Sequence, residues 1–327
     1  MTTIPLFPLN SGHTIPALGL GTYKMSEETA EYAVNEALHI GYRHIDTAQM
    51  YKNEAAVGRG IKKSGVARED IFLTTKLDNP NHAPADARRT FEQSLSDLQT
   101  DYVDLFLIHW PLLTGDYVDT WKVLEEFLAD GRARSIGVSN FEVHHLQALR
   151  NNTETVPAVN QIELHPYFQN IEVEQYSKDA GIRVEAWAPI ARGKVAEDRI
   201  VRELAEERDC TPAQLVLAWH LANYRIVFPK ASSREHLEEN FAAVDVRIFK
   251  ENVDEINNLD EFEAGRSGMH PDTMKRPASR RQAPEDLAAG LRGAYNRLPG
   301  NLAREASYLT TCYSPPARRM SWVRAYP

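Results

Sequence analysis

Short apolar segments alternate with longer amphipathic segments from residue 18 to residue 244. The apolar segments are five to eight residues long and rich in Val, Ile, Leu and Phe, a pattern typical of buried β-strands. Eight strands are expected, at residues 18–23, 44–48, 72–77, 103–110, 134–140, 158–164, 183–190 and 226–231. The intervening segments repeat apolar residues at helical spacing, and several end at Gly, a favoured C-terminal cap. These helices are expected at residues 27–40, 53–65, 84–98, 117–131, 141–150, 171–181, 199–209, 211–224 and 233–244.

Eight successive strand–helix units indicate a parallel α/β fold, for which two architectures compete. An open, doubly wound sheet that binds a dinucleotide should carry G-x-G-x-x-G after its first strand. The first strand here has Gly19 and Gly21, but Lys24 stands where the third Gly belongs. Since eight units also close a barrel, we expect a (β/α)8 TIM barrel. Ahead of it, residues 4–18 predict a β-hairpin with its turn at 10–12, which would plug the N-terminal end of the barrel.

Composition narrows the classes of function. The chain has 327 residues and a net charge of −9, so a nucleic-acid partner, which requires a basic face, is not expected. The only two cysteines, Cys210 and Cys312, favour a reducing compartment over a disulfide framework. The N-terminus lacks the basic and long apolar regions of a signal peptide, and no apolar stretch is long enough to cross a membrane. We therefore expect a cytoplasmic protein.

The charge of the chain changes sign near its C-terminus. Residues 1–274 carry a net charge of −16, whereas residues 275–327 carry +7, with Arg largely replacing Lys and with many Ala and Pro. We therefore divide the chain into a barrel at 1–274 and an atypical basic tail at 275–327. An out-of-frame or readthrough extension, expected to be poorly packed, is favoured over a basic interaction tail.

Polar and aromatic residues gather where function is found in such barrels, at the C-terminal ends of the strands. They are Tyr23, Asp46, Tyr51, Lys76, His109, Trp110, Ser139, Asn140, Gln161, Trp187 and Lys230. Asp46 and Lys76 follow neighbouring strands and should pair, because an isolated buried charge is costly. A Tyr beside an ammonium has its phenolate favoured, so we expect the pKa of Tyr51 to fall below its ordinary value of ~10. Such a phenol can donate a proton near neutral pH, while His109 positions a carbonyl oxygen.

Five spaced segments, GYRHIDTAQMYKNE, TTKL, IHWP, GVSNF and VNQIELHP, resemble the aldo-keto reductase superfamily. The resemblance covers residues 4–274 and is closest to bacterial members similar to 2,5-diketo-D-gluconate reductase. It implies a monomeric barrel that reduces aldehydes or ketones to alcohols with NADPH. The catalytic tetrad of the family matches Asp46, Tyr51, Lys76 and His109. Tyr51 would be the general acid, Lys76 its activator, Asp46 the anchor of Lys76, and His109 the orienter of the carbonyl. Each residue alone is more often structural, but the four together inside matching motifs favour catalysis.

The resemblance also implies a site for the cofactor. Its residues would be Trp187, stacked on the nicotinamide; Ser139, Asn140 and Gln161 at the carboxamide; Ile190, Arg192 and Gly193 at the pyrophosphate; Lys230, Ser232, Arg234 and His236 near the 2′-phosphate; Glu239 and Asn240 at the adenine; and Gly21, Thr22 and Asp46.

The 2′-phosphate segment departs from the family pattern K-S-x-x-x-x-R. Lys230 is kept, but Ala231 replaces the Ser and His236 replaces the Arg. The fixed fork of Arg grips phosphate in a way that His cannot reproduce. Arg234 either compensates or is an ordinary surface charge. We therefore expect NADPH with a weakened preference, so that NADH is also used.

The substrate pocket is expected to be an aromatic, partly apolar cup. Its walls would be Tyr23, Met50, Tyr51, His109 and Trp110. The loops at 110–118 and 188–194 are short, which suggests an open mouth and a broad range of small carbonyl substrates.

Two other classes of function compete. Some relatives use the barrel as a cofactor-sensing regulatory subunit of a membrane channel, but the complete tetrad and the lack of a docking extension argue against this. A metal-dependent hydrolase would need a His and carboxylate cluster at the strand ends. The pairs His144–His145 and His39/His44 lack the acidic or Cys company that a metal site needs, so no metal site is expected.

Overall fold

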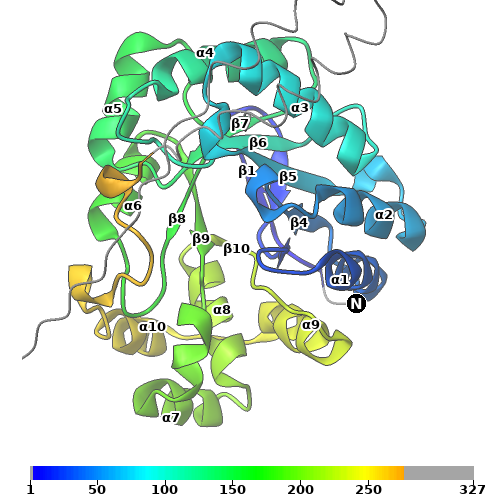
Figure 1. Ribbon diagram of the computed structural model, residues 1–327. Helices are drawn as coiled ribbons and strands as arrows, with labels where there is room; N and C mark the ends of the chain where they lie inside the picture. Colours follow the sequence, from blue (N-terminus) through cyan, green and yellow to red (C-terminus); the bar gives the residue numbers. More distant parts are fainter. Residues whose placement is uncertain (1–2, 276–327) are drawn as a thin grey trace, which may run out of the picture. The chain divides into compact units, whose positions relative to one another are not determined.

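The computed structural model describes residues 3–275 (Figure 1). Residues 1–2 and 276–327 lie outside the described part. Apart from Lys275, the atypical tail at 275–327 therefore lies there too. Its division from the barrel stays a prediction.

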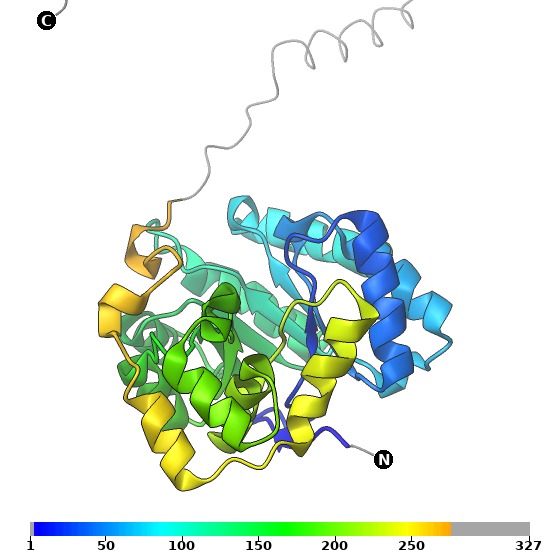
Figure 2. The same cartoon turned by 90° about the horizontal axis from the view of Figure 1, so that it is seen from below.

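The strands form a parallel barrel, as predicted (Figures 1 and 2). In chain order they are β3 (Leu20–Gly21), β4 (His44–Asp46), β5 (Phe72–Leu77), β6 (Leu105–Ile108), β7 (Ile136–Ser139), β8 (Val159–Glu163), β9 (Arg183–Trp187) and β10 (Ile226–Val227). Each strand pairs with the next along the chain. A parallel bridge between Leu18 and Val227 closes the ring, and the Gly19 amide donates to the Val227 carbonyl at 2.8 Å. This closure distinguishes the barrel from the open sheet.

Helices surround the strands in both views. They are α1 (Glu27–Ile40), α2 (Glu54–Ser64), α3 (Pro84–Leu98), α4 (Tyr117–Ala129), α5 (Val143–Asn152), α6 (Ile171–Asp179), α7 (Arg199–Glu207), α8 (Pro212–Ala222), α9 (Arg234–Phe241) and α10 (Lys250–Asn257). The sequence predicted nine of them and missed α10. That helix has only eight residues, and Val253 and Ile256 are its only apolar residues, too few to display a helical period.

The N-terminal hairpin closes one end of the barrel, as predicted. Strands β1 (Leu6–Pro8) and β2 (Thr14–Pro16) pair antiparallel, and the turn between them includes Gly12 at a φ of 86°. Phe7 and Ile15 pack into an apolar cluster with residues from the barrel strands, among them Leu105. The opposite end, where the parallel strands finish, is the end at which the active sites of such barrels lie.

Strand β5 shows how the sequence directs side chains to either side of the barrel wall. All six residues of FLTTKL are buried, as expected for a parallel strand covered on both faces. Phe72 belongs to the inner cluster with the hairpin, whereas Leu73 and Leu77 belong to the larger core under the helices. Because side chains alternate along a strand, Lys76 shares the inner face with Phe72. The Lys76 ammonium is therefore buried inside the barrel, near its open end.

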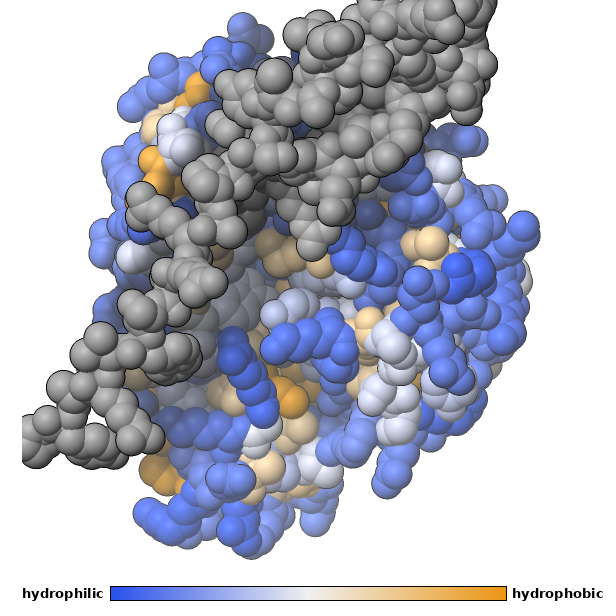
Figure 3. All heavy atoms as spheres, viewed as in Figure 1, coloured by the Kyte–Doolittle hydropathy of each residue, from blue (hydrophilic) through white to orange (hydrophobic). Residues whose placement is uncertain are grey.

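The surface is largely polar on the face shown in Figure 3, where apolar residues form small, separate groups. Within residues 3–275, no helix combines the length and apolar character that crossing a membrane requires.

Candidate active site

Lys76 and Asp46 form a buried ion pair at the C-terminal ends of β5 and β4. The Lys76 Nζ donates to Asp46 Oδ1 at 2.6 Å and to the Thr47 carbonyl at 2.9 Å. It also donates to Tyr51 Oη at 3.2 Å. Burial acts to lower the pKa of Lys76, but Asp46 and Tyr51 outweigh it, so the pKa is raised and the ammonium stays charged. The structure thus brings together three of the four predicted catalytic residues.

Tyr51 lies in a short 3-10 turn, η1 (Gln49–Tyr51), which is pinned to the neighbouring helix. The Gln49 amide donates to the Thr90 carbonyl and to Ser94 Oγ of α3, both at 3.1 Å. Its carbonyl oxygen accepts from the Asp78 amide at 3.0 Å. With the turn fixed on both sides, the phenol is held over Lys76 rather than left in a free loop.

The expected direction of the Tyr51 pKa shift is wrong. Burial is the largest influence and raises the pKa of Tyr51 to about 12, while Lys76 acts to lower it and Asp46 to raise it. The ammonium lies nearer to Asp46 than to Tyr51. The Asp46 carboxylate therefore offsets much of the effect of the ammonium on the pKa of the phenol. Tyr51 is therefore a neutral phenol at physiological pH, which is the form that can donate a proton.

His109 completes the group at the end of β6. Its ring meets the ring of Tyr51 edge-on, with centroids 5.8 Å apart. Burial, and then the charge of Lys76, lower the pKa of His109 well below its ordinary value, so the imidazole is neutral. Its Nδ1 is buried and has no hydrogen-bond partner among residues 3–275. A proton on Nε2 would avoid burying an unpaired N–H and would leave a donor for a carbonyl oxygen.

Glu185, a buried carboxyl group that the sequence analysis did not single out, is linked to the ion pair through Gln161. Gln161 Nε2 donates to Asp46 Oδ2 at 2.9 Å and to Glu185 Oε2 at 2.7 Å. Burial, and then the charge of Asp46, raise the pKa of Glu185 to about 8. With its amide hydrogens committed in this way, Gln161 has only its Oε1 for a nicotinamide carboxamide. A Glu inside the apolar run RVEAW was the signal that could have identified this residue.

Trp187, Asn140 and Ser139 form one connected network at the ends of β9 and β7. The Trp187 indole donates to Asn140 Oδ1 at 2.8 Å, and the indole is half-buried. Asn140 Nδ2 donates to Ser139 Oγ and to the His109 carbonyl, both at 3.0 Å. Asn140 adopts a φ of 63°, a left-handed conformation in which Asn is common. These bonds fix the plane of the indole, which leaves it as a platform beside the predicted catalytic residues.

The loop after β9 is conformationally strained. Ala188, Ala191 and Arg192 have φ values of 52°, 47° and 56°, and Gly193 has 95°. Left-handed residues other than Gly cost about 1–3 kcal/mol each and cluster at ligand clamps. Ile190 lies between them and is partly buried. The Ala191 and Gly193 amides donate to the Ala188 and Ile190 carbonyls at 2.8 and 2.9 Å, so they are not presented to an anion, and the pyrophosphate contact stays a prediction.

The residues predicted to meet a 2′-phosphate are engaged elsewhere or exposed. Arg234 donates to Glu36 Oε2 of α1 and to Glu238 Oε1, both at 2.8 Å. His236 Nδ1 lies 3.1 Å from Glu239 Oε2. Lys230 is exposed, and its Nζ donates to the Lys24 carbonyl at 3.1 Å. The Arg234 contacts favour its interpretation as a surface charge that joins α9 to α1.

Some of the remaining predicted cofactor residues already contact other parts of the protein. Thr22 Oγ1 donates to the Asp46 carbonyl at 3.1 Å. A Cβ on Gly21 would lie 2.6 Å from the Phe228 carbonyl, so barrel closure itself requires a Gly there. Ser232 is exposed before α9, whereas Asn240 is buried within it.

The predicted substrate wall is aromatic and open. Tyr23 is half exposed, and its ring centroid lies 5.1 Å from that of Tyr51. Met50 and Trp110 are partly buried. The structure therefore places the Tyr23 ring beside the phenol.

A C-terminal segment that the sequence analysis did not connect with Trp187 lies against this tryptophan. We refer to residues 266–274 as the C-terminal segment. Glu163 at the end of β8 is 2% exposed and accepts hydrogen bonds from the amides of Ser267 at 2.7 Å and Gly268 at 2.9 Å. A Cβ on Gly268 would approach the Trp187 indole to 2.4 Å. Burial acts to raise the pKa of Glu163, but hydrogen bonds from His165 and residues 267–268 outweigh it and hold the pKa below its ordinary value.

The far end of the C-terminal segment is also attached. The Leu113 amide, in the loop after β6, donates to the Met274 carbonyl at 3.0 Å. The segment is therefore held at one end beside Trp187 and at the other beside the predicted substrate loop.

The expectation that His144 and His145 lack acidic company is wrong. The fold brings Asp272 of the C-terminal segment within 3.2 Å of His144 and 3.5 Å of His145. Sequence distance concealed this contact, because only the tertiary structure returns the C-terminal segment to α5.

Comparisons with known proteins agree with the geometry. The Aldo/keto reductase family matches residues 17–261. The chain is 42% identical over 275 residues to methylglyoxal reductase DkgA of Salmonella typhimurium, covering 83% of this chain and 98% of that protein. It is 41% identical over 267 residues to glyoxal reductase of Bacillus subtilis, covering 81% and 96%. A solved structure of a variant of Gox0644 in complex with NADPH superposes with a TM-score of 0.80 at 39% identity, covering 84% and 99%.

Proposed function

The chain belongs to the aldo/keto reductase family, and from this premise we propose that Tyr51 protonates the carbonyl oxygen of its substrate. The chain is an NADP-dependent oxidoreductase that reduces aldehydes and ketones to alcohols. The observation that carries the proposal is the hydrogen bond from the buried Lys76 ammonium to the Tyr51 hydroxyl, 3.2 Å long.

The proton is transferred by residues whose charges are fixed before the substrate binds. Tyr51 is neutral because its pKa is raised to about 12, so its proton is available throughout the physiological range. As the carbonyl oxygen becomes negative, Tyr51 releases this proton and becomes a phenolate. The Lys76 ammonium stabilises that phenolate, and Asp46 keeps Lys76 in position at 2.6 Å. The ion pair therefore favours the product state of the proton transfer.

His109 orients the substrate. As a neutral imidazole it donates one hydrogen bond to the carbonyl oxygen and does not compete with Tyr51 as an acid. Its ring lies beside that of Tyr51, with centroids 5.8 Å apart, so one carbonyl oxygen bound between the two rings would meet both donors.

The residues at the barrel mouth fit NADPH. When bound, NADPH supplies the hydride, which no side chain can provide. The half-buried face of Trp187 would hold the nicotinamide, and the left-handed loop at 190–193 would hold the pyrophosphate. Lys230 would meet the 2′-phosphate as a single ammonium. Since His236 cannot form the Arg fork and Arg234 is held by two carboxylates, the chain also accepts NADH.

The substrates are small carbonyl compounds, with α-dicarbonyls such as methylglyoxal and glyoxal foremost. Two relatives are named as reductases of these compounds. The predicted substrate residues Tyr23, Met50 and Trp110 are aromatic or apolar and partly exposed, which suits small, partly apolar molecules. The proposed site recognises its substrate through two hydrogen bonds to the carbonyl oxygen. Every aldehyde has such an oxygen, so the range of substrates is broad.

Steady-state oxidation of NADPH by a panel of methylglyoxal, glyoxal, simple aldehydes, α-keto esters and keto-sugars tests the proposal. We expect turnover with the small aldehydes and weaker turnover with NADH. Quenching of tryptophan fluorescence would report cofactor binding separately. Binding of NADPH without turnover of any carbonyl would contradict the proposal and favour the regulatory, cofactor-sensing alternative.

The chain is further proposed to act as a monomer in the cytoplasm. The complete set of predicted catalytic residues within one barrel supports a monomer, and two widely separated cysteines are in keeping with a reducing compartment. Analytical ultracentrifugation and cell fractionation would test the two statements, and a stable dimer or a secreted protein would overturn them.

A further inference from the structure

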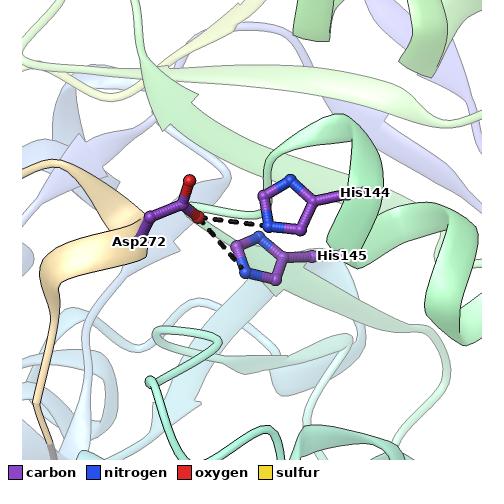
Figure 4. A group of neighbouring side chains, drawn as sticks. All are labelled: His144, His145 and Asp272. Carbon is purple, nitrogen blue, oxygen red and sulfur yellow. Dashed lines mark ion pairs between the residues drawn. The ribbon is translucent and has the colours of Figure 1, made fainter.

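Three potential metal ligands from two distant parts of the chain meet on the surface (Figure 4). His144 and His145 lie in the first turn of α5, and Asp272 lies in η7 (Pro271–Thr273) of the C-terminal segment. Figure 4 shows both imidazoles pointing toward the Asp272 carboxylate. None of the three residues belongs to the reductase site.

The spacing of the three ligand atoms suits a tetrahedral ion. Asp272 Oδ1 lies 3.2 Å from His144 Nε2 and 3.5 Å from His145 Nε2. All three atoms lie within 4.8 Å of one another. Ligands at about 2.0–2.1 Å from Zn²⁺ in tetrahedral geometry lie about 3.3–3.4 Å apart. The two contacts therefore approximate the edges of a zinc tetrahedron.

The chemistry of the ligands also fits zinc. Two imidazoles and one carboxylate form a ligand set that zinc sites use, and the fourth position would be left for water. His270 Nδ1 lies 4.0 Å from Asp272 Oδ2, at the edge of the group.

His145 is the most constrained of the three ligands. Its Nδ1 accepts a hydrogen bond from the Glu142 amide at 3.1 Å, so its proton resides on Nε2, the atom that faces Asp272. A metal at Nε2 requires this proton to move to Nδ1, so the ring must give up the hydrogen bond from the Glu142 amide.

We propose that His144, His145 and Asp272 bind one Zn²⁺ ion, which fastens the C-terminal segment to α5. The ion would add a third attachment to a segment already held by Glu163 at one end and by Leu113 at the other. Metal binding would thereby order the backbone around residues 270–274.

Isothermal titration of the full chain with Zn²⁺ tests the proposal. A Cys210→Ser/Cys312→Ser background removes both thiols as competing ligands. We expect one ion per chain, and at least tenfold weaker binding in His144→Gln and in Asp272→Asn. His13→Gln, an exposed histidine elsewhere, is the matched control and should bind as the parent does. The side chains of His144 and Asp272 are 59% and 45% exposed, so neither substitution should prevent folding.

Hydrogen exchange provides a second measurement that does not depend on catalysis. Zn²⁺ should slow exchange of peptides covering residues 266–274 and the start of α5, and this protection should disappear in Asp272→Asn. Equal zinc affinity in the parent and both variants, no binding in the parent, or protection elsewhere only would each overturn the proposal.

Discussion

The Lys76 ammonium lies 3.2 Å from the Tyr51 hydroxyl, although 25 residues separate them in the chain. The contact depends on Asp46, which holds the same ammonium at 2.6 Å. The phenol is thus protonated at rest, and a charge beside it is ready to stabilise the phenolate.

Removal of the phenolic proton should abolish most of the reductase activity. Tyr51→Phe keeps the ring but eliminates the acid, so kcat for aldehyde reduction should fall by about 10²–10⁴. Steady-state kinetics with methylglyoxal would measure the loss. Tyr32→Phe, on the exposed face of α1, removes a hydroxyl remote from the site and should leave kcat unchanged. Unaltered turnover in Tyr51→Phe would refute the assignment of the acid.

Restoring an arginine at position 236 should sharpen the cofactor preference. A charge-assisted hydrogen bond contributes about 1.5–3 kcal/mol, so His236→Arg should increase the ratio of kcat/KM for NADPH over NADH by roughly 10–100-fold. The change should come mainly from a lower KM for NADPH. His13→Arg adds the same charge in the N-terminal hairpin as a control. If the parent already showed a strong NADPH preference that His236→Arg did not alter, Lys230 would suffice.

Crowding the C-terminal segment should disturb Trp187, the proposed platform for the nicotinamide. In Gly268→Ala the new methyl group would lie 2.4 Å from the Trp187 ring, and such overpacking costs about 1–3 kcal/mol. We expect a raised KM for NADPH together with a shifted tryptophan emission. Glu163→Gln weakens the attachment without adding volume and should raise the same KM by less.

Glu172→Gln on the exposed face of α6 makes the matching change of charge and should have no effect. A Gly268→Ala enzyme with parental KM and emission would show that the segment does not position Trp187.

The buried Glu185 should make stability fall as the pH rises. Its pKa is about 8 in the folded chain and about 4.3 when unfolded, so the folded state holds an extra proton between these values. Its stabilising contribution is complete below the unfolded pKa and is lost as the pH rises through about 8, by at most about 1.4 kcal/mol per pH unit. Glu185→Gln cannot titrate, and its Tm should change less between pH 5 and pH 8. An unchanged Tm profile in the variant would contradict this origin.

The chain should fold without its basic tail. Met274 accepts the last backbone hydrogen bond described for the C-terminal segment, from Leu113 at 3.0 Å. Truncation after Lys275 preserves this bond, so Tm and kcat/KM should match those of the full chain in differential scanning fluorimetry and steady-state assays. A large loss of stability would show that residues 276–327 are integral to the fold.

The sequence by itself determined the barrel and the identity of the four predicted catalytic residues. Eight apolar runs separated by amphipathic helices admit few arrangements, and β5 places Lys76 on an inner face by alternation alone. The motif around Asp46 and Tyr51 is local, so it could be found by inspection of one segment.

Only the tertiary structure decided the protonation of Tyr51 and the contacts between distant segments. The pKa of Tyr51 depends on how completely water is excluded from the phenol and on how much of the Lys76 charge Asp46 compensates. Neither quantity can be obtained from the amino-acid sequence alone. The contact of Asp272 with His144 likewise requires the chain to circle the barrel and return to α5. Periodicity reports neighbours within an element, whereas burial and long-range contacts exist only once the ring of strands has closed.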